Sequence, residues 1–409
     1  MCCKCSSFNG IEKRPKLQFR DANGQLFPAW KQYRFDMLYK PVSEKNDLSY
    51  GVESIISVAN MYFKPDARIS DPEYLRTYNI FKYGDIAFEG NKSKSYANGR
   101  FVENTIGDGI VSHVFNVLRP LSPIHNLEYW KYAINNENVM GRILARCTKK
   151  TTMMTNLVTS DFMEQEICCP VESEQEKIAL FLSLIERRLI AQEQLVEHLK
   201  KYKRGVVKTL LDPKQNQRQG VIWTTDTIGK LGTFIKGAAL SKADISDFGT
   251  PFVLYGELYT TYKEVVRSIV RATQASVDDV YLSKVGDVVI PTSGETPEEI
   301  STASCIMVPD VILAGDLNIY RSTIVDGRIM SYLLNHIVNE QIARVAQGKS
   351  VVHVQATEVG KISITYPDHN EQERIAQILE LIDNRIAVSE KALNSMQMMK
   401  KALLQQLFI

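Results

Sequence analysis

The sequence predicts an α+β fold, with two globular domains separated by two long antiparallel coiled-coil helices and related by a pseudo-twofold internal repeat. Three observations predict this fold. The chain has 409 residues, which is too long for one ordinary hydrophobic core. A helical segment near the middle of the chain is repeated at its end. The two segments outside the repeat present similar features in the same order.

The repeated segment reads SEQEKIALFLSLIERRL at 173–189 and NEQERIAQILELIDNRI at 370–386. The two copies lie 197 positions apart and align without a gap over some forty residues. Each copy follows a proline, Pro170 or Pro367, and has acidic residues early and basic residues late, as the helix dipole favours. A repeat of this length predicts two similar long helices.

Apolar residues in each copy are spaced alternately three and four positions apart, which is the heptad pattern of a coiled coil. A helix of about 40 residues is roughly 60 Å long and cannot bury such a seam alone. We expect the two copies to pair with each other, although pairing with other chains is the alternative. Both copies also place a lysine, Lys203 or Lys400, at a matching seam position. The predicted seam consists of Leu182, Ile185, Leu189, Gln192, Val196, Leu199, Leu379, Ile382, Ile386, Ser389, Leu393 and Met396.

These features predict four segments: globular domains at 1–167 and 213–366, and helices at 168–212 and 367–409. Each globular segment has an early tryptophan and a strand that follows Lys-x-Gly-Asp, at 82–88 and 284–290. A polar loop, a second strand and a helix follow in both, with the helices expected at 127–146 and 328–346. The shared order indicates that the globular domains are also related.

Composition excludes several classes of protein. Apolar residues make up 44% of the chain, but no run of about 18 of them could span a membrane. Seven irregularly spaced cysteines favour a reduced chain, and the N-terminus lacks the apolar core of a secretory signal, so we expect a cytoplasmic protein. Because the net charge is only +2, binding to phosphates must depend on local clusters of cations.

Sequence signatures of catalysis are absent. The chain has no glycine-rich cofactor loop after a strand, no GxxxxGK[ST] phosphate loop, no HExxH and no GxSxG. Six scattered histidines show no paired spacing typical of a metal site. We therefore expect a binding or scaffold protein with no catalytic residue, no cofactor and no metal.

Several stretches resemble one protein family, the specificity (S) subunits of type I restriction–modification enzymes. The opening 14–19 with Trp30 is similar to the start of that family, and 223–232 is similar to the entry to its second target-recognition domain. The two repeats resemble its central and C-terminal conserved regions. The resemblance covers essentially the whole chain. One departure is that 31–36 lacks the expected Leu-Gly after Trp30.

The resemblance implies a non-catalytic subunit that recognises double-stranded DNA with a bipartite target. Each globular domain would read one half of the site, and the helices would set the spacing between the halves. Two methyltransferase subunits would dock on the chain and restriction/translocase subunits could join them, so cofactor binding would belong to those partners. The alternative is a coiled-coil protein-interaction adaptor without DNA readout.

Candidate DNA contacts are loop residues with hydrogen-bonding or cationic side chains, because donors and acceptors read base edges and cations neutralise phosphates. In the first globular segment they are Lys92, Ser93, Lys94, Asn98, Arg100, Lys149, Lys150, Thr151 and Thr152. In the second they are Ser241, Lys242, Tyr255, Tyr259, Thr292, Ser293, Lys349, Ser350 and His353.

Overall fold

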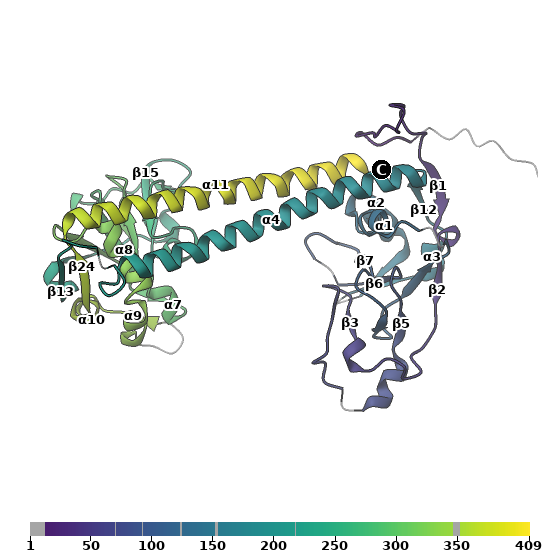
Figure 1. Ribbon diagram of the computed structural model, residues 1–409, viewed down its shortest axis with the longest axis horizontal. Helices are drawn as coiled ribbons and strands as arrows, with labels where there is room; N and C mark the ends of the chain where they lie inside the picture. Colours follow the sequence, from purple (N-terminus) through teal and green to yellow (C-terminus); the bar gives the residue numbers. More distant parts are fainter. Residues whose placement is uncertain are drawn as a thin grey trace, which may run out of the picture. The chain divides into compact units, whose positions relative to one another are not determined.

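The computed structural model (Figure 1) describes residues 13–69, 71–91, 93–122, 125–151, 154–216, 218–346 and 352–409. The chain divides into two compact units, and each is described by itself. Unit 1 comprises residues 1–192 and 392–409, and unit 2 comprises residues 193–391. The fold is a mixture of helices and strands, as predicted. Among the described residues, every helix is too short or too polar to cross a membrane.

Unit 1 is built on a four-stranded antiparallel sheet with the strand order β2-β9-β6-β7. These strands are β2 (Tyr39–Val42), β6 (Ile86–Glu89), β7 (Arg100–Glu103) and β9 (Val117–Pro120). Helices α1 (Leu127–Ala133) and α2 (Glu137–Cys147) pack against β7. Burial alternates along β7, and buried Phe101 joins the same core as Trp130 and Leu144 of these helices. The largest core of unit 1 therefore lies between the sheet and α1–α2.

The globular part of unit 1 also contains three two-stranded pairs, besides the pair that precedes α4, and several short helices. The pairs are β3 (Ile56–Ser57) with β4 (Tyr62–Phe63), β5 (Asn79–Phe81) with β8 (Gly109–Val111), and β10 (Thr148–Lys150) with β11 (Thr155–Leu157). The short helices are η1 (Phe35–Met37), η2 (Val52–Ser54), η3 (Pro72–Thr77) and α3 (Thr159–Met163).

Unit 2 has a five-stranded sheet with the order β14-β22-β18-β20-β16 and a three-stranded sheet with the order β17-β15-β21. The first contains β14 (Gly232–Lys236), β16 (Val265–Val266), β18 (Asp287–Pro291), β20 (Ser304–Ile306) and β22 (Leu317–Ser322). The second contains β15 (Thr250–Leu254), β17 (Arg271–Thr273) and β21 (Ile312–Ala314). A further pair joins β19 (Ser293–Gly294) to β23 (Val352–His353).

The helices of unit 2 are mostly short. They are α5 (Ile228–Leu231), η4 (Lys242–Asp244), α6 (Glu257–Thr260), η5 (Asp279–Tyr281), α7 (Pro297–Ile300), α8 (Gly327–His336), α9 (Asn339–Val345) and α10 (Ala356–Lys361). Helix α8 packs on β18 and β20, and its residues Ile329, Met330 and Leu333 are fully buried in the largest core of the unit.

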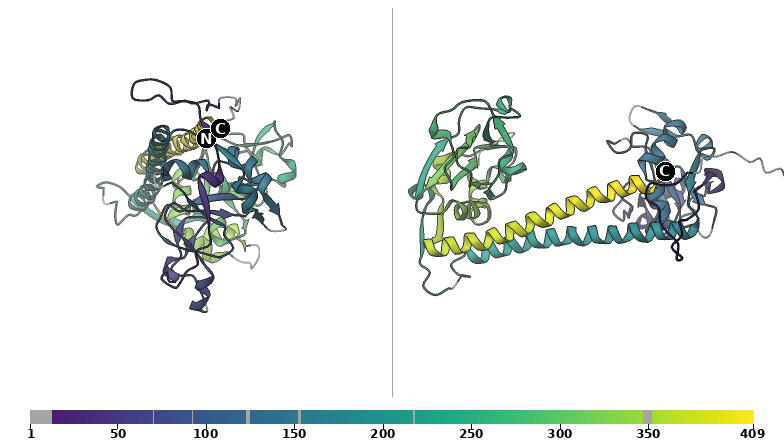
Figure 2. Two further views of the ribbon diagram at one scale, coloured as in Figure 1. Left: turned by 90° about the vertical axis from the view of Figure 1, so that its right-hand side faces the viewer. Right: turned by 90° about the horizontal axis from the view of Figure 1, so that it is seen from above.

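The repeated segments form two helices of 39 residues each, α4 (Glu172–Leu210) and α11 (His369–Leu407), which are drawn as continuous ribbons in Figure 2. Each helix contributes residues to both units. Within unit 2, Lys200 pairs with Glu390 at 3.1 Å and Lys203 pairs with Asp383 at 2.6 Å. Because the partner number falls as the α4 number rises, the two helices run antiparallel in this unit.

Each long helix begins directly after a two-stranded antiparallel pair. Strand β1 (Lys31–Arg34) pairs with β12 (Glu166–Cys169) before α4, and β13 (Trp223–Thr227) pairs with β24 (Ser363–Pro367) before α11. In unit 1 the buried Trp30 donates its indole N–H to Glu174 Oε2 at 3.2 Å, which ties the start of the globular part to the first turn of α4.

The Lys-x-Gly-Asp stretches form the same turn in both units. Gly84 and Gly286 have φ of 85° and 93°, a conformation that favours glycine. The following aspartates, Asp85 and Asp287, accept the backbone N–H of Lys82 and Lys284 at 2.9 and 2.8 Å. Asp85 also accepts two guanidinium hydrogen bonds from Arg119, at 2.8 and 2.9 Å, and Asp287 accepts three from Arg321, at 3.0 to 3.1 Å.

The predicted helices at 127–146 and 328–346 are each broken into two. In unit 1 the side chain of Asn136 accepts the N–H of Asn138 and so caps a new helix, α2. Asparagine favours such caps because its short side chain competes for backbone N–H groups. In unit 2, α8 ends at His336 and α9 begins at Asn339. The prediction of a single helix was wrong at both places.

Candidate DNA-recognition surfaces

The predicted contact residues of unit 1 lie on neighbouring loops. The loop after β6 is held on one side by Thr155, which donates its N–H to the carbonyl of Gly90 at 2.8 Å. On the other side Asn98 Nδ2 donates to the carbonyl of Gly141 in α2 at 3.3 Å. These bonds bring Ser93 and Lys94 to the same region as the β10–β11 hairpin, which carries Lys149, Lys150 and Thr151. Lys92 and Thr152 lie outside the described residues.

The predicted DNA-contact residues of unit 1 differ in exposure and in the hydrogen bonds that their side chains make. Lys94, Lys149 and Lys150 are exposed. Arg100 instead donates Nε to Glu89 and Nη2 to the carbonyl of Ala59, both at 2.7 Å. Its guanidinium therefore binds within the globular part. Contact with DNA by any of these residues stays a prediction.

In unit 2 the predicted Ser293 and His353 are cross-strand partners in the β19–β23 pair. Thr292 donates its N–H to the carbonyl of Asp316 at 2.8 Å, and buried Ser293 donates its hydroxyl to the Asp316 carboxylate at 3.0 Å. His353 is exposed. Lys349 and Ser350 lie outside the described residues.

The other predicted residues of unit 2 lie on η4 and around α6. Ser241 caps η4 and donates its N–H to Asp244, while Lys242 is exposed. The rings of Tyr255 and Tyr259 are half-buried and meet edge to face at 6.5 Å. Burial, together with nearby Glu299, raises the pKa of Tyr259. Their role in DNA contact also stays a prediction.

Sequence reasoning missed two exposed arginines, Arg142 and Arg146, on α2. The helix buries Met140, Ile143 and Leu144, so the arginines occupy its outer face. The spacing of these apolar residues could have revealed them, because positions between buried ones on an amphipathic helix face solvent.

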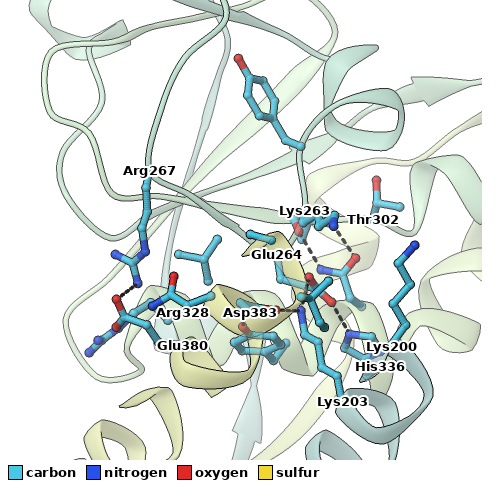
Figure 3. Close-up of a pocket in the computed structure, with 18 of the residues that line it drawn as sticks. Lys200, Lys203, Lys263, Glu264, Arg267, Thr302, Arg328, His336, Glu380 and Asp383 are labelled. Atoms are coloured by element: carbon cyan, nitrogen blue, oxygen red, sulfur yellow. Dashed lines mark hydrogen bonds and ion pairs between the residues drawn. The ribbon is translucent and has the colours of Figure 1, made fainter. Parts of the chain in front are cut away.

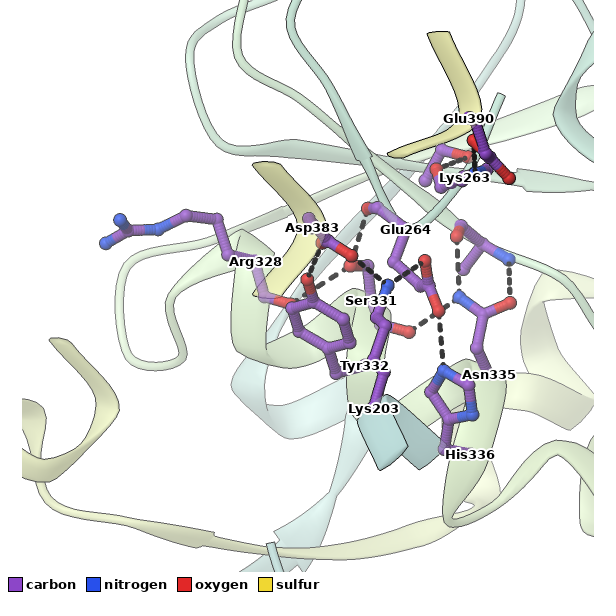
Figure 4. Close-up of polar contacts among 12 residues, drawn as sticks. Lys203, Lys263, Glu264, Arg328, Ser331, Tyr332, Asn335, His336, Asp383 and Glu390 are labelled. Atoms are coloured by element: carbon purple, nitrogen blue, oxygen red, sulfur yellow. Dashed lines mark hydrogen bonds and ion pairs between the residues drawn. The ribbon is translucent and has the colours of Figure 1, made fainter. Parts of the chain in front are cut away.

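A second feature missed from sequence is a polar pocket of about 540 Å³ in unit 2, between α8 and the long helices (Figure 3). At its floor the buried Lys203 pairs with Glu264 at 2.8 Å and with Asp383 at 2.6 Å. His336 Nε2 lies 2.6 Å from the other oxygen of Glu264, and Tyr332 donates its hydroxyl to Asp383 (Figure 4). We call Lys203, Glu264, Tyr332, His336 and Asp383 the unit 2 lock.

The lock connects three parts of the chain: α4 through Lys203, α11 through Asp383, and the globular part of unit 2 through Glu264 and α8. Burial would raise the pKa of Glu264, but His336 and Lys203 outweigh it and lower that pKa to about 2. Buried charges are tolerated only when they are paired in this way. The lock therefore fixes the globular part of unit 2 on its helices.

Unit 1 contains a smaller version of the same arrangement. Lys400 of α11 pairs with Glu186 of α4 at 2.7 Å, and Tyr132 of α1 donates its hydroxyl to Glu186. Lys400 and Glu186 are the residues that align with Lys203 and Asp383 at the offset of 197. We call Tyr132, Glu186 and Lys400 the unit 1 lock.

Among the described residues, the possible metal ligands and the buried thiols bear on whether a reactive site is present. No group of three or more His, Cys, Asp or Glu within them is placed to hold a metal ion. Burial raises the pKa of the Cys147, Cys169 and Cys305 thiols to about 12, so these thiols stay protonated and unreactive at neutral pH.

Comparison with known proteins gives a fold for the chain and a family for part of it. The chain is similar to the crystal structure of a type I restriction–modification system S subunit from M. genitalium. That similarity has 18% identity and a TM-score of 0.57, and it covers 97% of this chain and 99% of that one. A structure from work on complex assembly and conformational transition of the type I R-M system is 15% identical with a TM-score of 0.58, covering 92% and 95%. At these identities the structures show a shared fold.

A match by sequence covers most of the second half of the chain. No curated protein matches the chain. Residues 221–397, however, match the family model of the type I restriction modification DNA specificity domain. The resemblance predicted from the sequence is thus confirmed, as is a role in DNA sequence recognition. Residues 221–397 of this chain are thus similar to the type I restriction modification DNA specificity domain.

Proposed function

We propose that the chain is a non-catalytic specificity subunit, in which each globular domain reads one half of a bipartite DNA target. The family match covers 221–397 only, so the first half needs its own argument. The supporting observation is that two side-chain arrangements found in unit 2 recur in unit 1. Unit 1 repeats the Asp–Arg turn, with Asp85 and Arg119, and the lock, with Glu186 and Lys400. We infer that 1–167 and 213–366 are two related recognition domains.

The remaining segments, 168–212 and 367–409, would form the spacer that sets the gap between the two half-sites. Their predicted seam residues support this, because every one of the twelve is buried or half-buried. Large apolar side chains on other faces of the same helices are exposed, including Leu180 at 61% in unit 1 and Leu381 at 71% in unit 2. Contiguous exposed apolar patches mark protein interfaces, and these side chains are candidates for such contacts. They support docking of two methyltransferase subunits, which restriction/translocase subunits could join.

The direct test is to map methylated bases in the genome of cells with and without this gene. We expect a single bipartite motif, two short defined halves around an undefined gap, to lose its methylation when the gene is removed. Restoring the gene should restore the motif. An unchanged set of methylated sites in cells whose methyltransferase is active would contradict DNA recognition and favour an adaptor role.

The spacer is tested by inserting one heptad into each long helix at matching positions, after Ala191 in α4 and after Val388 in α11. Seven residues add about 10.5 Å of helix, which corresponds to about three base pairs at about 3.4 Å each. We therefore expect the motif to keep both halves while its gap lengthens by about three base pairs. Methylation mapping measures the gap. An unchanged gap in an active complex would show that the helices do not set it.

A further inference from the structure

Unit 1 carries a cluster of exposed cations around α2. The cluster consists of Lys94, Arg142, Arg146, Lys149 and Lys150. The bond from Asn98 to Gly141 holds the loop of Lys94 beside α2, and β10 follows α2 directly. Within the described residues none of the five cations forms an ion pair. Acidic groups in this region are half-buried Glu137 of α2 and exposed Asp161 of α3, which packs on α2, while Lys94 lines a pocket that also contains buried Glu103 and half-buried Glu186. The exposed charge around α2 is therefore mostly positive.

The corresponding face of unit 2 carries the opposite charge. Exposed Glu295 follows β19, exposed Glu298 lies in α7, and exposed Asp316 lies beside Thr292 and Ser293. Helix α7 packs on α9, where exposed Glu340 lies 3.5 Å from Arg344. Arg344 is the exposed cation of α9, and its charge is largely balanced by Glu340. The exposed side chains in the described part of this face are therefore mostly acidic.

This difference matters because phosphates and bases contribute to binding in different ways. Each phosphate that a protein neutralises adds about 0.9 to the slope of log affinity against log salt. Carboxylates near DNA add no such term and repel phosphates, but they accept hydrogen bonds from exocyclic amino groups such as cytosine N4. A basic face and an acidic face in one chain cannot bind the duplex with equal salt dependence.

We propose that the two recognition domains contribute differently to DNA binding. This proposal rests on the proposed function above. The first domain neutralises phosphates through α2 and its flanking loops, and it supplies most of the salt-dependent affinity. The second domain reads bases through acceptor-rich contacts and contributes little to the salt dependence. Arg142 and Arg146 are phosphate-contacting residues in this division, beyond the contacts predicted from sequence.

The experiment uses the full chain assembled with its methyltransferase subunits and a duplex that carries the motif found by methylation mapping. Its affinity is measured as a function of NaCl concentration. For Arg142→Gln with Arg146→Gln and Lys150→Gln, we expect the salt slope to fall by about 2 to 3 and affinity at low salt to fall at least about tenfold. Glutamine keeps the propensity of the helix, so urea unfolding should be unchanged.

The comparison variant in unit 2, Arg344→Gln with Lys361→Gln, removes the exposed cations of α9 and α10 and should leave the slope unchanged. Equal losses of slope in the two variants, or no loss in the unit 1 variant, would overturn the division of work. Wild-type complex that does not prefer the motif over unrelated DNA would instead overturn the proposed function itself. The two failures are thus separate outcomes of one titration.

Discussion

Lys203→Met is expected to lower the free energy of unfolding of unit 2 by about 3 kcal/mol, because it leaves two carboxylates without their shared cation. Lys203 is 6% exposed and lies between Glu264 and Asp383. Its ammonium also lies 5.0 Å from the centre of the Tyr332 ring. Methionine fills a similar volume, so the loss comes from charge rather than from a cavity. Urea unfolding at neutral pH measures it.

The matched control is Lys200→Met, one turn earlier on the same helix. Lys200 is 37% exposed and pairs with Glu390, so we expect a loss below about 1 kcal/mol. Adding Glu264→Gln to Lys203→Met should recover part of the lost stability, because it removes one of the two uncompensated charges. If Lys203→Met cost no more than Lys200→Met, the lock would not hold the globular part of unit 2 in place.

The lock also predicts a dependence on pH. Its partners lower the pKa of Glu264 from its ordinary value of 4.5 to about 2. A carboxylate with a lowered pKa contributes stability that is fully present above its unfolded-state pKa and is lost as pH falls through the folded-state pKa. The stability difference between wild type and Lys203→Met should therefore be constant near neutral pH and shrink as pH falls from about 4.5 toward 2.

The long helices were predictable because their signal is local and repeated. A heptad pattern requires only the spacing of apolar residues along one segment, and two aligned copies reinforce each other. The Lys-x-Gly-Asp turns were also visible, since glycine marks the positive φ that the turn requires at Gly84 and Gly286. Features that depend only on neighbouring residues could thus be predicted from the sequence.

The locks were not predictable because their members come from distant segments. Lys203 was expected in the helix seam, but nothing along the sequence connects it to Glu264 or His336, which are 61 and 133 positions away. The β19–β23 pair likewise joins Ser293 to His353 through tertiary contacts. The breaks at Asn136 and before Asn339 were missed for another reason, since the spacing of apolar residues continues across them. At Asn136 the side chain caps the new helix, whereas α9 begins without a side-chain cap.

Substitution of Glu103 is expected to have the second large effect on stability, because its carboxyl group is buried in unit 1 without a hydrogen-bond partner. Both oxygens have no hydrogen-bond partner within the described structure, and the residue is 4% exposed. Burial, together with the charge of Glu128, raises the pKa of Glu103 to about 9 despite nearby Lys131. Cys305 occupies the corresponding position opposite β18 in unit 2, where a thiol avoids this cost.

A raised pKa means that the folded chain holds a proton that the unfolded chain releases above about pH 4.5. The stability of unit 1 should therefore fall as pH rises from 4.5 toward 9. Glu103→Gln keeps the shape and removes the titration, so we expect it to stabilise unit 1 by a few kcal/mol at about pH 8. Urea unfolding of wild type and variant at about pH 7 and about pH 8.5 measures this effect.

That pH range separates Glu103 from His125, another group of unit 1 whose pKa is strongly shifted. Burial lowers the pKa of His125 to about 4, so His125 affects stability only below its ordinary pKa of 6.5. The control is Glu128→Gln, since Glu128 is 53% exposed and should change stability little at either pH. If wild type and Glu103→Gln lost stability equally between the two pH values, Glu103 would be ionised in the folded chain. Its negative charge would then have to be balanced by a neighbouring cation, and Lys131 is the one that the fold places within reach.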